Sequence, residues 1–439
     1  MIRLLYWYSQ RGIAHALHVD TRETKRKYKT HDNLMTPVND ILSDITPLLS
    51  GCNRPLKMSF EDQLNFLVYF HLEEHRSGSH LVQVLKEAHF ARQHIEPMGD
   101  IEKSSIFEDI GSRGLEQMME MFGKLYAKAA KHLPKGYAEL GDLVLIDGSL
   151  VDDVLSMYWA DYRKNSKKPK VHIGFDLNRG IPKKIFLTDG KEAERLVVEK
   201  ILAPGETGVM DRGYQSHKLF DAWQADEKHY ICRIRFSTGK TIVRTNDVQA
   251  DSIVFYDAVV LLGTSGINQT ERELRLVGYR VANVNYWIAT DRHDLTAEQI
   301  VFAYKLSWNI EILFGWWKRH LKVYHLISRS QYGLMVQMLA GLTTYILLAI
   351  YCHDQHHEKV SVKRLREISI NIRNEMSIED IVNEAGVWIY QPPNLNQSHA
   401  NSCPDIAGQH PGFAEHLKMV SDSSLYLNDD NLWREKGER

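Results

Sequence analysis

Residues 304–318 read YKLSWNIEILFGWWK, and the rest of the chain can be interpreted outward from this stretch. A helix turns about 100° per residue, so residues three, four and seven apart share a face. One face of the predicted helix is apolar and should pack on a core: Leu306, Ile310, Leu313 and Trp317. A second face is polar: Tyr304, Ser307, Glu311 and Lys318. A carboxylate between a tyrosine and a lysine suits a metal and phosphate site, although a solvated helix surface has the same pattern.

The composition is that of a globular protein. Of the 439 residues, 44% are hydrophobic and 25% charged, which is enough core material for about two or three domains. The net charge is −2, so nucleic acid would have to bind at local basic patches. The four cysteines, Cys52, Cys232, Cys352 and Cys403, form no CxxC pair. Their scatter argues against a disulfide framework or structural zinc and predicts a cytoplasmic protein.

The first 140 residues divide into a basic arm and a helical region. The arm, residues 1–34, has little apolar periodicity, and its basic run is Arg22, Lys25, Arg26, Lys27 and Lys29. Such a segment either binds DNA or is disordered. Residues 35–140 repeat apolar side chains at helical spacing, as at Phe60, Leu64, Leu67 and Phe70. They predict an all-α N-terminal domain, which fits a DNA-binding module and equally a scaffold.

From residue 141 the pattern changes to an α/β domain. Residues 143–146 are a short apolar strand ending at Asp147, and residues 170–187 form a hairpin. A helix, a strand ending at Asp211, a second helix and a further strand follow as far as residue 234. This is the order of an RNase-H-like mixed sheet, so we expect a catalytic domain over residues 141–355. A β-rich insertion at about residues 236–290 interrupts it.

The C-terminal part contains one long apolar segment and a polar tail. Residues 333–352 are apolar enough for a membrane span, but Gln337, Thr343 and Thr344 favour a helix buried in the protein, and no membrane partner is expected. Residues 356–439 predict further helices and a loose tail. The end of the apolar helix gathers four metal-binding residue types, whose spacing matches no standard zinc pattern: Cys352, His353, His356 and His357.

Three acids lie where such a fold would bring them together. Asp147 and Asp211 end neighbouring strands at the edge where α/β sheets present their active sites. Glu311 lies on a helix that can pack against the same sheet. Three carboxylates offer hard oxygen ligands for two Mg²⁺ or Mn²⁺ ions, which promote in-line phosphoryl displacement. No P-loop, GxGxxG or GxSxG motif competes with this interpretation.

At these motifs the chain resembles bacterial insertion-sequence transposases of the DDE class, in the IS-four group. The resemblance covers about residues 55–350 and is carried by LIDGS at Asp147, the hairpin KVHIGFDLNRGIP, VMDRGY at Asp211, and the helix at Glu311. The group's helix signature is Tyr, two residues, Arg, three residues, Glu, six residues, Lys. Tyr304, Glu311 and Lys318 match it, whereas Ser307 stands where the arginine is expected.

The resemblance implies a role for each site residue. Asp147, Asp211 and Glu311 would be catalytic and bind the metals, Tyr304 and Lys318 would contact phosphates of the transposon end, and Arg212 would contact DNA or support the site. Trp287 would either stack on a flipped base, as in hairpin-forming relatives, or pack in the core. Lys167 and Lys168 belong to a basic cluster with Arg163, Lys164 and Lys170 that either follows a DNA backbone or is a solvated loop. Ser307 cannot supply the charge of arginine, and Lys305 points elsewhere on a regular helix.

The predicted function is therefore a transposase. It would cut at the terminal inverted repeats of its element and transfer the 3′-hydroxyl ends to target DNA, as a homodimer that holds two ends. Two alternatives stay open: a decayed or repurposed DNA-binding protein, which Ser307 would explain, and a stand-alone RNase-H-like nuclease.

Overall fold

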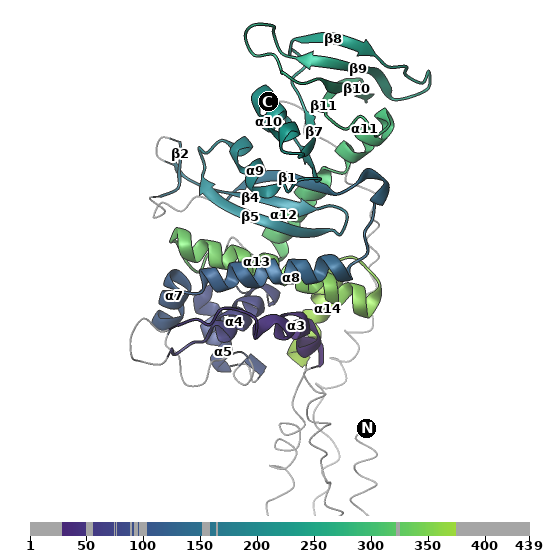
Figure 1. Cartoon of the computed structure of the whole chain (residues 1–439). Helices are drawn as coiled ribbons and strands as arrows, with labels where there is room; N and C mark the ends of the chain where they lie inside the picture. The colour runs from purple at the N-terminus through teal and green to yellow at the C-terminus, as the bar shows by residue number, and fades with distance from the viewer. Residues whose placement is uncertain are drawn as a thin grey trace, which may run out of the picture. The chain divides into compact units, whose positions relative to one another are not determined.

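A nine-stranded sheet forms the centre of the structure (Figure 1). The computed structural model describes residues 29–49, 56–73, 75, 77–87, 90–91, 95, 103–151, 159–163, 166–321 and 325–374. The strands lie in the order β5-β4-β1-β6-β7-β11-β10-β9-β8. Their bounds are β1 (Leu143–Leu150), β4 (Pro169–Asp176), β5 (Ile181–Asp189), β6 (Thr207–Met210), β7 (His229–Arg233), β8 (Lys240–Thr245), β9 (Val254–Leu262), β10 (Leu274–Val281) and β11 (Val284–Thr290). Two short strands, β2 (Asp161–Arg163) and β3 (Ser166–Lys167), pair with each other.

The first five strands of this order form an RNase-H-like sheet. β1 is parallel to β6, and β6 is parallel to β7, whereas β4 runs antiparallel to both β1 and β5. The apolar run 143–146 at the start of β1 is buried on both faces, which explains why it lacks the alternation of a half-exposed strand. The predicted fold class, an α/β RNase-H-like sheet preceded by helices, is confirmed.

The β-rich insertion continues the same sheet. β11 pairs antiparallel with β7, with Ile288 opposite Arg233, and β10, β9 and β8 follow outward. All six residues of β8 are exposed, and Lys240 and Arg244 place charges on this edge strand. Charged side chains on an edge strand discourage pairing with other chains. The insertion predicted at about residues 236–290 is therefore present as an extension of the catalytic sheet.

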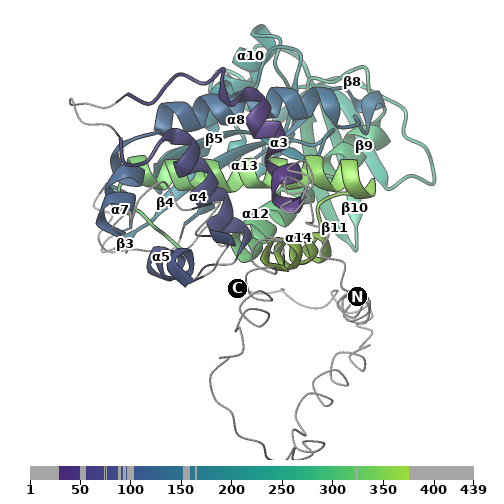
Figure 2. The same cartoon turned by 90° about the horizontal axis from the view of Figure 1, so that it is seen from below.

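Helices cover one face of the sheet in two layers (Figures 1 and 2). The bounds are α3 (Lys29–Leu42), α4 (Phe60–Leu72), α5 (Gly78–Glu87), α7 (Lys103–Ser112), α8 (Leu115–His132), α13 (Gln331–His356) and α14 (Val362–Asn374). α8 and α13 pack on β5, and α3, α4 and α7 pack against these two helices. α13 is long and apolar enough to cross a membrane, but 89% of its apolar window is buried within the protein, so the prediction of a buried core helix is confirmed.

The other face of the sheet carries shorter elements: η2 (Glu194–Val197), α9 (Val198–Ile201) and α10 (His217–Ala225). Val144 and Ile146 of β1 point to this face and pack in one cluster with Ile201 and Trp223. Leu145 points to the opposite face, into the core shared with α8 and α13. β1 is thus fixed from both sides.

Two predicted borders need correction, and others lie outside the described residues. α3 begins at Lys29, so residues 29–34, assigned to the basic arm, are helical. Residues 1–28 and 375–439, which hold the rest of the arm and most of the predicted tail, lie outside the described residues. α13 continues to His356, and α14 follows it, as expected for a helical segment after the catalytic domain.

The helix predicted through residues 304–318 is divided into α11 (Ala297–Lys305) and α12 (Trp308–His320). The Asn309 side-chain amide donates to the Leu306 carbonyl oxygen at 2.8 Å, while the Ile310 amide bonds to Ser307 at 3.1 Å. In a regular helix the Leu306 carbonyl oxygen would accept from the Ile310 amide. Here the Asn309 side chain donates to it instead, which explains the break. The predicted apolar face is nevertheless buried, since Ile310, Leu313 and Trp317 are at most 4% exposed.

Candidate active site

Asp147 lies on β1, one residue beyond the last pair of β1 with β6, Ile146 and Met210. The prediction that the strand ends at Asp147 was wrong, because β4 continues to pair with β1 as far as Leu150. Asp147 itself is half-buried, and its Oδ1 accepts a hydrogen bond from the Gly148 amide at 2.7 Å. The carboxylate is therefore held at the point where the parallel pair of strands opens.

Asp211 follows β6 directly, as predicted, and caps the short 3₁₀ turn η3 (Arg212–Tyr214). Its Oδ1 accepts a hydrogen bond from the Gly213 amide at 2.6 Å. A Cβ atom at residue 213 would lie only 2.9 Å from Glu194 Oε2 and 3.0 Å from Asp211 Oδ1. Glycine at 213 thus lets the turn approach the acids closely.

Glu311 lies in the first turn of α12, which packs on β1. Its side chain is exposed, whereas Leu313 and Trp317 on the other face of α12 are buried. The buried face fixes the rotation of the helix, so the carboxylate is directed away from the core. Because α12 contacts the strand that carries Asp147, Glu311 comes from the correct element to complete a three-acid site.

The charges of the three acids act on one another. Burial, together with the carboxylates of Asp211 and Glu311, raises the pKa of Asp147 to about 6, although the Gly148 amide and Lys170 oppose the rise. Burial, and then Asp211, also raises the pKa of Glu311. The structure therefore brings all three predicted acids together.

This donor set fits divalent cations. Repelling carboxylates are stabilised by a bound hard cation, for which oxygen is the preferred ligand. Among the residues that the structure describes, the three carboxylates are not gathered within 4.8 Å of one another. A pair of ions about 3.5–4 Å apart needs ligands spread more widely than a single ion does.

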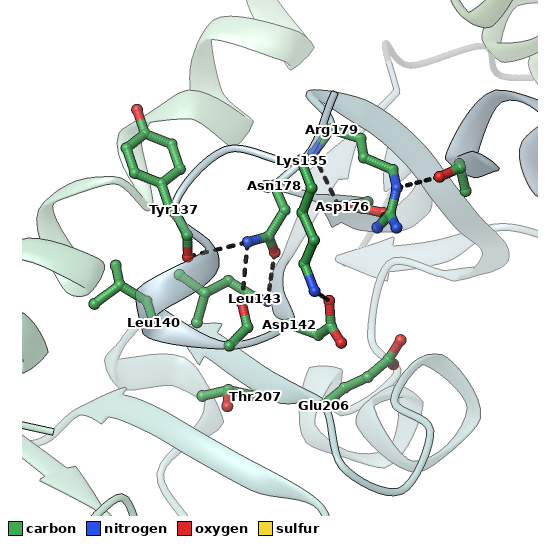
Figure 3. A network of polar contacts seen from close by, with 12 residues as sticks. Lys135, Tyr137, Leu140, Asp142, Leu143, Asp176, Asn178, Arg179, Glu206 and Thr207 are labelled. Carbon is green, nitrogen blue, oxygen red and sulfur yellow. Dashed lines mark hydrogen bonds and ion pairs between the residues drawn. The ribbon is translucent and has the colours of Figure 1, made fainter. Parts of the chain in front are cut away.

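The starting ends of the two acid-bearing strands are fixed by buried polar side chains. Asn178 accepts a hydrogen bond from the Leu143 amide at 2.7 Å and donates one to the Tyr137 carbonyl oxygen at 3.4 Å (Figure 3). Its amide group also donates to the carbonyl oxygens of Gly136 and Gly141 at 2.8 and 2.9 Å. These bonds hold the loop that leads into β1. Such satisfied buried networks restrict a loop to one arrangement.

The Arg292 guanidinium joins the starting ends of β1 and β6. Its Nη1 donates to the Leu140 carbonyl oxygen at 3.1 Å, just before β1, and to Thr207 Oγ1 at 2.6 Å, at the start of β6. Asp294 holds the other side of the guanidinium at 2.8 Å. The register of β1 against β6, and with it the position of Asp147 beside Asp211, is thereby set from the far end of the strands.

Two lysines lie at the acids. Lys318 of α12 donates to Ser149 Oγ, two residues beyond Asp147 on the same face of β1. Lys170 forms an ion pair with Glu194, and the charges of Asp147 and Asp211 act on it. Lys318 was predicted at the site, and Lys170 belonged to the predicted basic cluster. Ser149 was missed, although its spacing from Asp147 is the signal for a shared strand face.

Tyr304 lies at the end of α11, in contact with an arginine that sequence reasoning missed. Burial raises the pKa of Tyr304 to about 12, while Arg233 of β7 hydrogen-bonds to its hydroxyl and opposes that rise. The charge of Asp211 also reaches Tyr304. The Arg233 guanidinium lies 4.9 Å from the centre of the Tyr286 ring. A fixed positive charge is thus present beside Tyr304 although residue 307 is serine.

The other predicted DNA contacts lie in different surroundings. Trp287 is 9% exposed and packs at 5.4 Å from Phe255 and 5.1 Å from Tyr256, with Lys240 Nζ 4.2 Å from its ring centre. Its surroundings are those of a core residue, and the base contact stays a prediction. Arg212 is exposed beside Asp211, and Lys168 is half-buried. The side chain of Lys167 lies outside the described residues.

A polar cavity of about 610 Å³ lies next to η3 and α10. Three exposed cations line it, Arg195, Lys218 and Arg235, together with Gln215, which directly follows η3, and the loop at Asn268. Arg195 directly follows Glu194, the partner of Lys170, so the cavity begins beside the acids. Asp221 and Glu271 also line the cavity, so its cations exceed its acids by one. The three cations could bind phosphates of a nucleic-acid strand, and no sequence motif indicated the cavity.

Comparison with known proteins bears on this arrangement. The family described as "Transposase DDE domain" matches residues 140–347, which include all three acids. The match spans just under half of the 439 residues, and over this part the chain is similar to a DDE transposase domain. Enzymes of this family are polynucleotidyl transferases, and the match covers the RNase-H-like sheet, its insertion, α11, α12 and most of α13.

Three relatives of this chain are described as transposases, two of them for named insertion sequence elements. Transposase y4zB of Sinorhizobium fredii is 25% identical over 55% of this chain and 67% of its own length. The transposase for insertion sequence element IS5377 of Geobacillus stearothermophilus is 25% identical over 46% of this chain and 54% of its own. The transposase for element IS4SA of Synechocystis is 23% identical over 54% and 67%, which supports the IS-four group.

Among solved structures, a piggyBac transposase synaptic complex with hairpin DNA is 12% identical to this chain, with a TM-score of 0.40. The similarity covers 85% of this chain and 82% of that chain.

Proposed function

We propose that this chain is a transposase that cuts DNA at the terminal inverted repeats of its insertion sequence and transfers the freed 3′-hydroxyl ends to target DNA. The observation that carries the proposal is the convergence of Asp147, Asp211 and Glu311 from β1, the turn after β6 and α12. It acts in the cytoplasm, as a dimer on two transposon ends.

The three carboxylates would hold two Mg²⁺ or Mn²⁺ ions. When bound, such ions activate the attacking oxygen and stabilise the leaving oxygen of an in-line displacement. Two of these acids are held in a state that suits metal binding. Glycine amides hold one oxygen of Asp147 and one of Asp211, so the remaining oxygens are available, and Lys170 favours the ionised form of Asp147.

The two chemical steps use the same site. In the first, water attacks the phosphorus at the element boundary, the P–O3′ bond breaks, and the element keeps a 3′-hydroxyl. In the second, that hydroxyl attacks a target phosphodiester, and the target's own 3′-oxygen leaves. Lys318, Tyr304 and Arg233 lie around the acids and would bind the scissile strand, while the cavity at Arg195 and Arg235 would hold phosphates further along it.

Labelled DNA carrying the element's terminal repeats tests the proposal, with the protein added in Mg²⁺ or in EDTA. We expect Mg²⁺-dependent nicking at the repeat boundary and strand transfer to added plasmid. Asp211→Ala and Glu311→Ala should each abolish nicking yet keep end binding. Asp251→Ala, on an exposed loop, should keep both nicking and end binding. Cleavage without end preference would indicate a stand-alone nuclease, and binding without cleavage a decayed copy.

A further inference from the structure

A second cluster of metal-binding side chains lies where α8 and α13 end. His132 is the last residue of α8, and His353 and Asp354 lie in the last turn of α13. Each offers one ligand atom, and these atoms all lie within 4.8 Å of one another. His132 Nε2 lies 2.6 Å from Asp354 Oδ1. None of these residues belongs to the active site described above.

The two imidazoles have the spacing of ligands to one ion. Their ring centres are 5.7 Å apart and their planes are at 85°. With metal–nitrogen bonds of about 2 Å, two imidazoles at a tetrahedral angle have ring centres roughly 5 Å apart. Only a small adjustment would place both nitrogens and the Asp354 oxygen on one centre. Two histidines and a carboxylate are a donor set for zinc and similar transition metals, whereas magnesium prefers oxygen ligands alone.

The helix ends provide a favourable electrostatic setting. The C-terminal end of a helix carries a partial negative charge from its unpaired carbonyl groups. Here the ends of two helices meet, together with the carboxylate of Asp354, so a divalent cation is attracted from both. The side chains of His132 and Asp354 are 48% and 38% exposed, which leaves them accessible to an incoming ion and to water as a fourth ligand.

We propose that His132, His353 and Asp354 bind one transition-metal ion of the zinc class, which joins α8 to α13. α8 lies in the helical region before the catalytic sheet and α13 after it, so the ion would link two parts of the chain 222 residues apart. Its role would be structural, because the ion would join two packed helices.

At this helix end the sequence offers four metal-binding residue types, but their spacing matches no standard zinc pattern. Cys352, His353, His356 and His357 were the residues that it offered. Cys352 is buried, and its sulfur is not among the ligand atoms that lie within 4.8 Å of one another. Instead, His353 is joined by Asp354 of α13 and by His132 of α8. The histidine at 356 packs beside Tyr351, at 6.1 Å between ring centres, and serves as a control.

The test must separate this site from the catalytic acids. The full chain carrying Asp147→Ala and Glu311→Ala, freed of metal by a chelator, is titrated with Zn²⁺ by calorimetry and with Co²⁺ by absorption spectroscopy. We expect one ion per chain, the visible absorption of tetrahedral Co²⁺, and a higher melting temperature with Zn²⁺. Adding His132→Ala or Asp354→Ala should weaken binding at least about tenfold, which is the lower end of the loss for an outer-shell partner.

His356→Ala in the same background is the matched control and should change neither affinity nor spectrum. Circular dichroism establishes that each variant is folded, and His353→Gln provides a second variant that keeps the side-chain volume similar. The proposal is overturned if the folded parent binds no Co²⁺ or Zn²⁺. It is also overturned if His132→Ala and His353→Gln bind as tightly as the parent, or if His356→Ala loses binding to the same extent.

Discussion

Replacing Asp147 by asparagine should make the metal-free protein more stable at neutral pH, although it removes a carboxylate that we propose to be catalytic. The ionised Asp147 is half-buried and is repelled by Asp211 and Glu311. Asparagine removes the charge but keeps an oxygen in the position that accepts the Gly148 amide. The substitution therefore relieves repulsion without disrupting the local hydrogen bond.

The pKa of Asp147 gives the magnitude and the sign. Its rise from 3.8 to about 6 on folding means that the folded state disfavours the ionised form. At about 1.4 kcal/mol per pKa unit, the charged side chain costs at most about 3 kcal/mol of stability above pH 6. Screening by solvent reduces this value. The cost shrinks as the pH falls from 6 and disappears below 3.8, where both states bind the proton.

Urea denaturation of the full chain in EDTA measures the effect at several pH values. We expect Asp147→Asn to have the higher midpoint at pH 8 and the same midpoint as the parent at pH 4. Mg²⁺ should reverse the order at pH 8, because it stabilises the parent through the carboxylate that the variant lacks. Asp251→Asn, on an exposed loop, is the control. Equal stability at pH 8 in EDTA, or a difference that persists unchanged at pH 4, would refute the reasoning.

Two further predictions concern other residues. Arg275→Met should cost about 3–5 kcal/mol of unfolding free energy, because it leaves the buried carboxylate of Asp257 without its partner at 2.7 Å. Adding Asp257→Asn should recover part of the lost stability, measured by urea denaturation. If stability does not recover, the unpaired charge of Asp257 is not the cause of the loss. Arg233→Gln should slow nicking about tenfold to a hundredfold by removing a charge-assisted phosphate contact. Ser307→Arg should restore part of the rate, and an unaffected rate in Arg233→Gln would exclude its role.

Local patterns were sufficient to predict the elements that carry the acids. The apolar run before Asp147 and the similar run before Asp211 are strands because such residues are buried on both faces of a parallel pair. The spacing of Ile310, Leu313 and Trp317 gave the rotation of the helix that presents Glu311. Each of these signals spans only a few residues of the chain.

What the sequence could not reveal depends on contacts between distant parts of the chain. The break at Ser307 depends on the side chain of Asn309, which takes a carbonyl that a regular helix would use. Arg233 reaches Tyr304 only because β7 and α11 pack together in the fold. His132 joins Asp354 across 222 residues. No spacing rule along one chain predicts such pairs.

The pairing of β7 with β11 has a consequence for how this protein can change. The chain leaves the catalytic sheet at Arg233 and returns at Ile288, and these two residues lie directly opposite each other. Everything between them begins and ends at one place, so its length does not affect where α11 and α12 start. The outer edge of the segment, at β8, can therefore change without moving the start of α11. β9 and β10 contact α11, so these two strands support the position of Glu311 and must be kept.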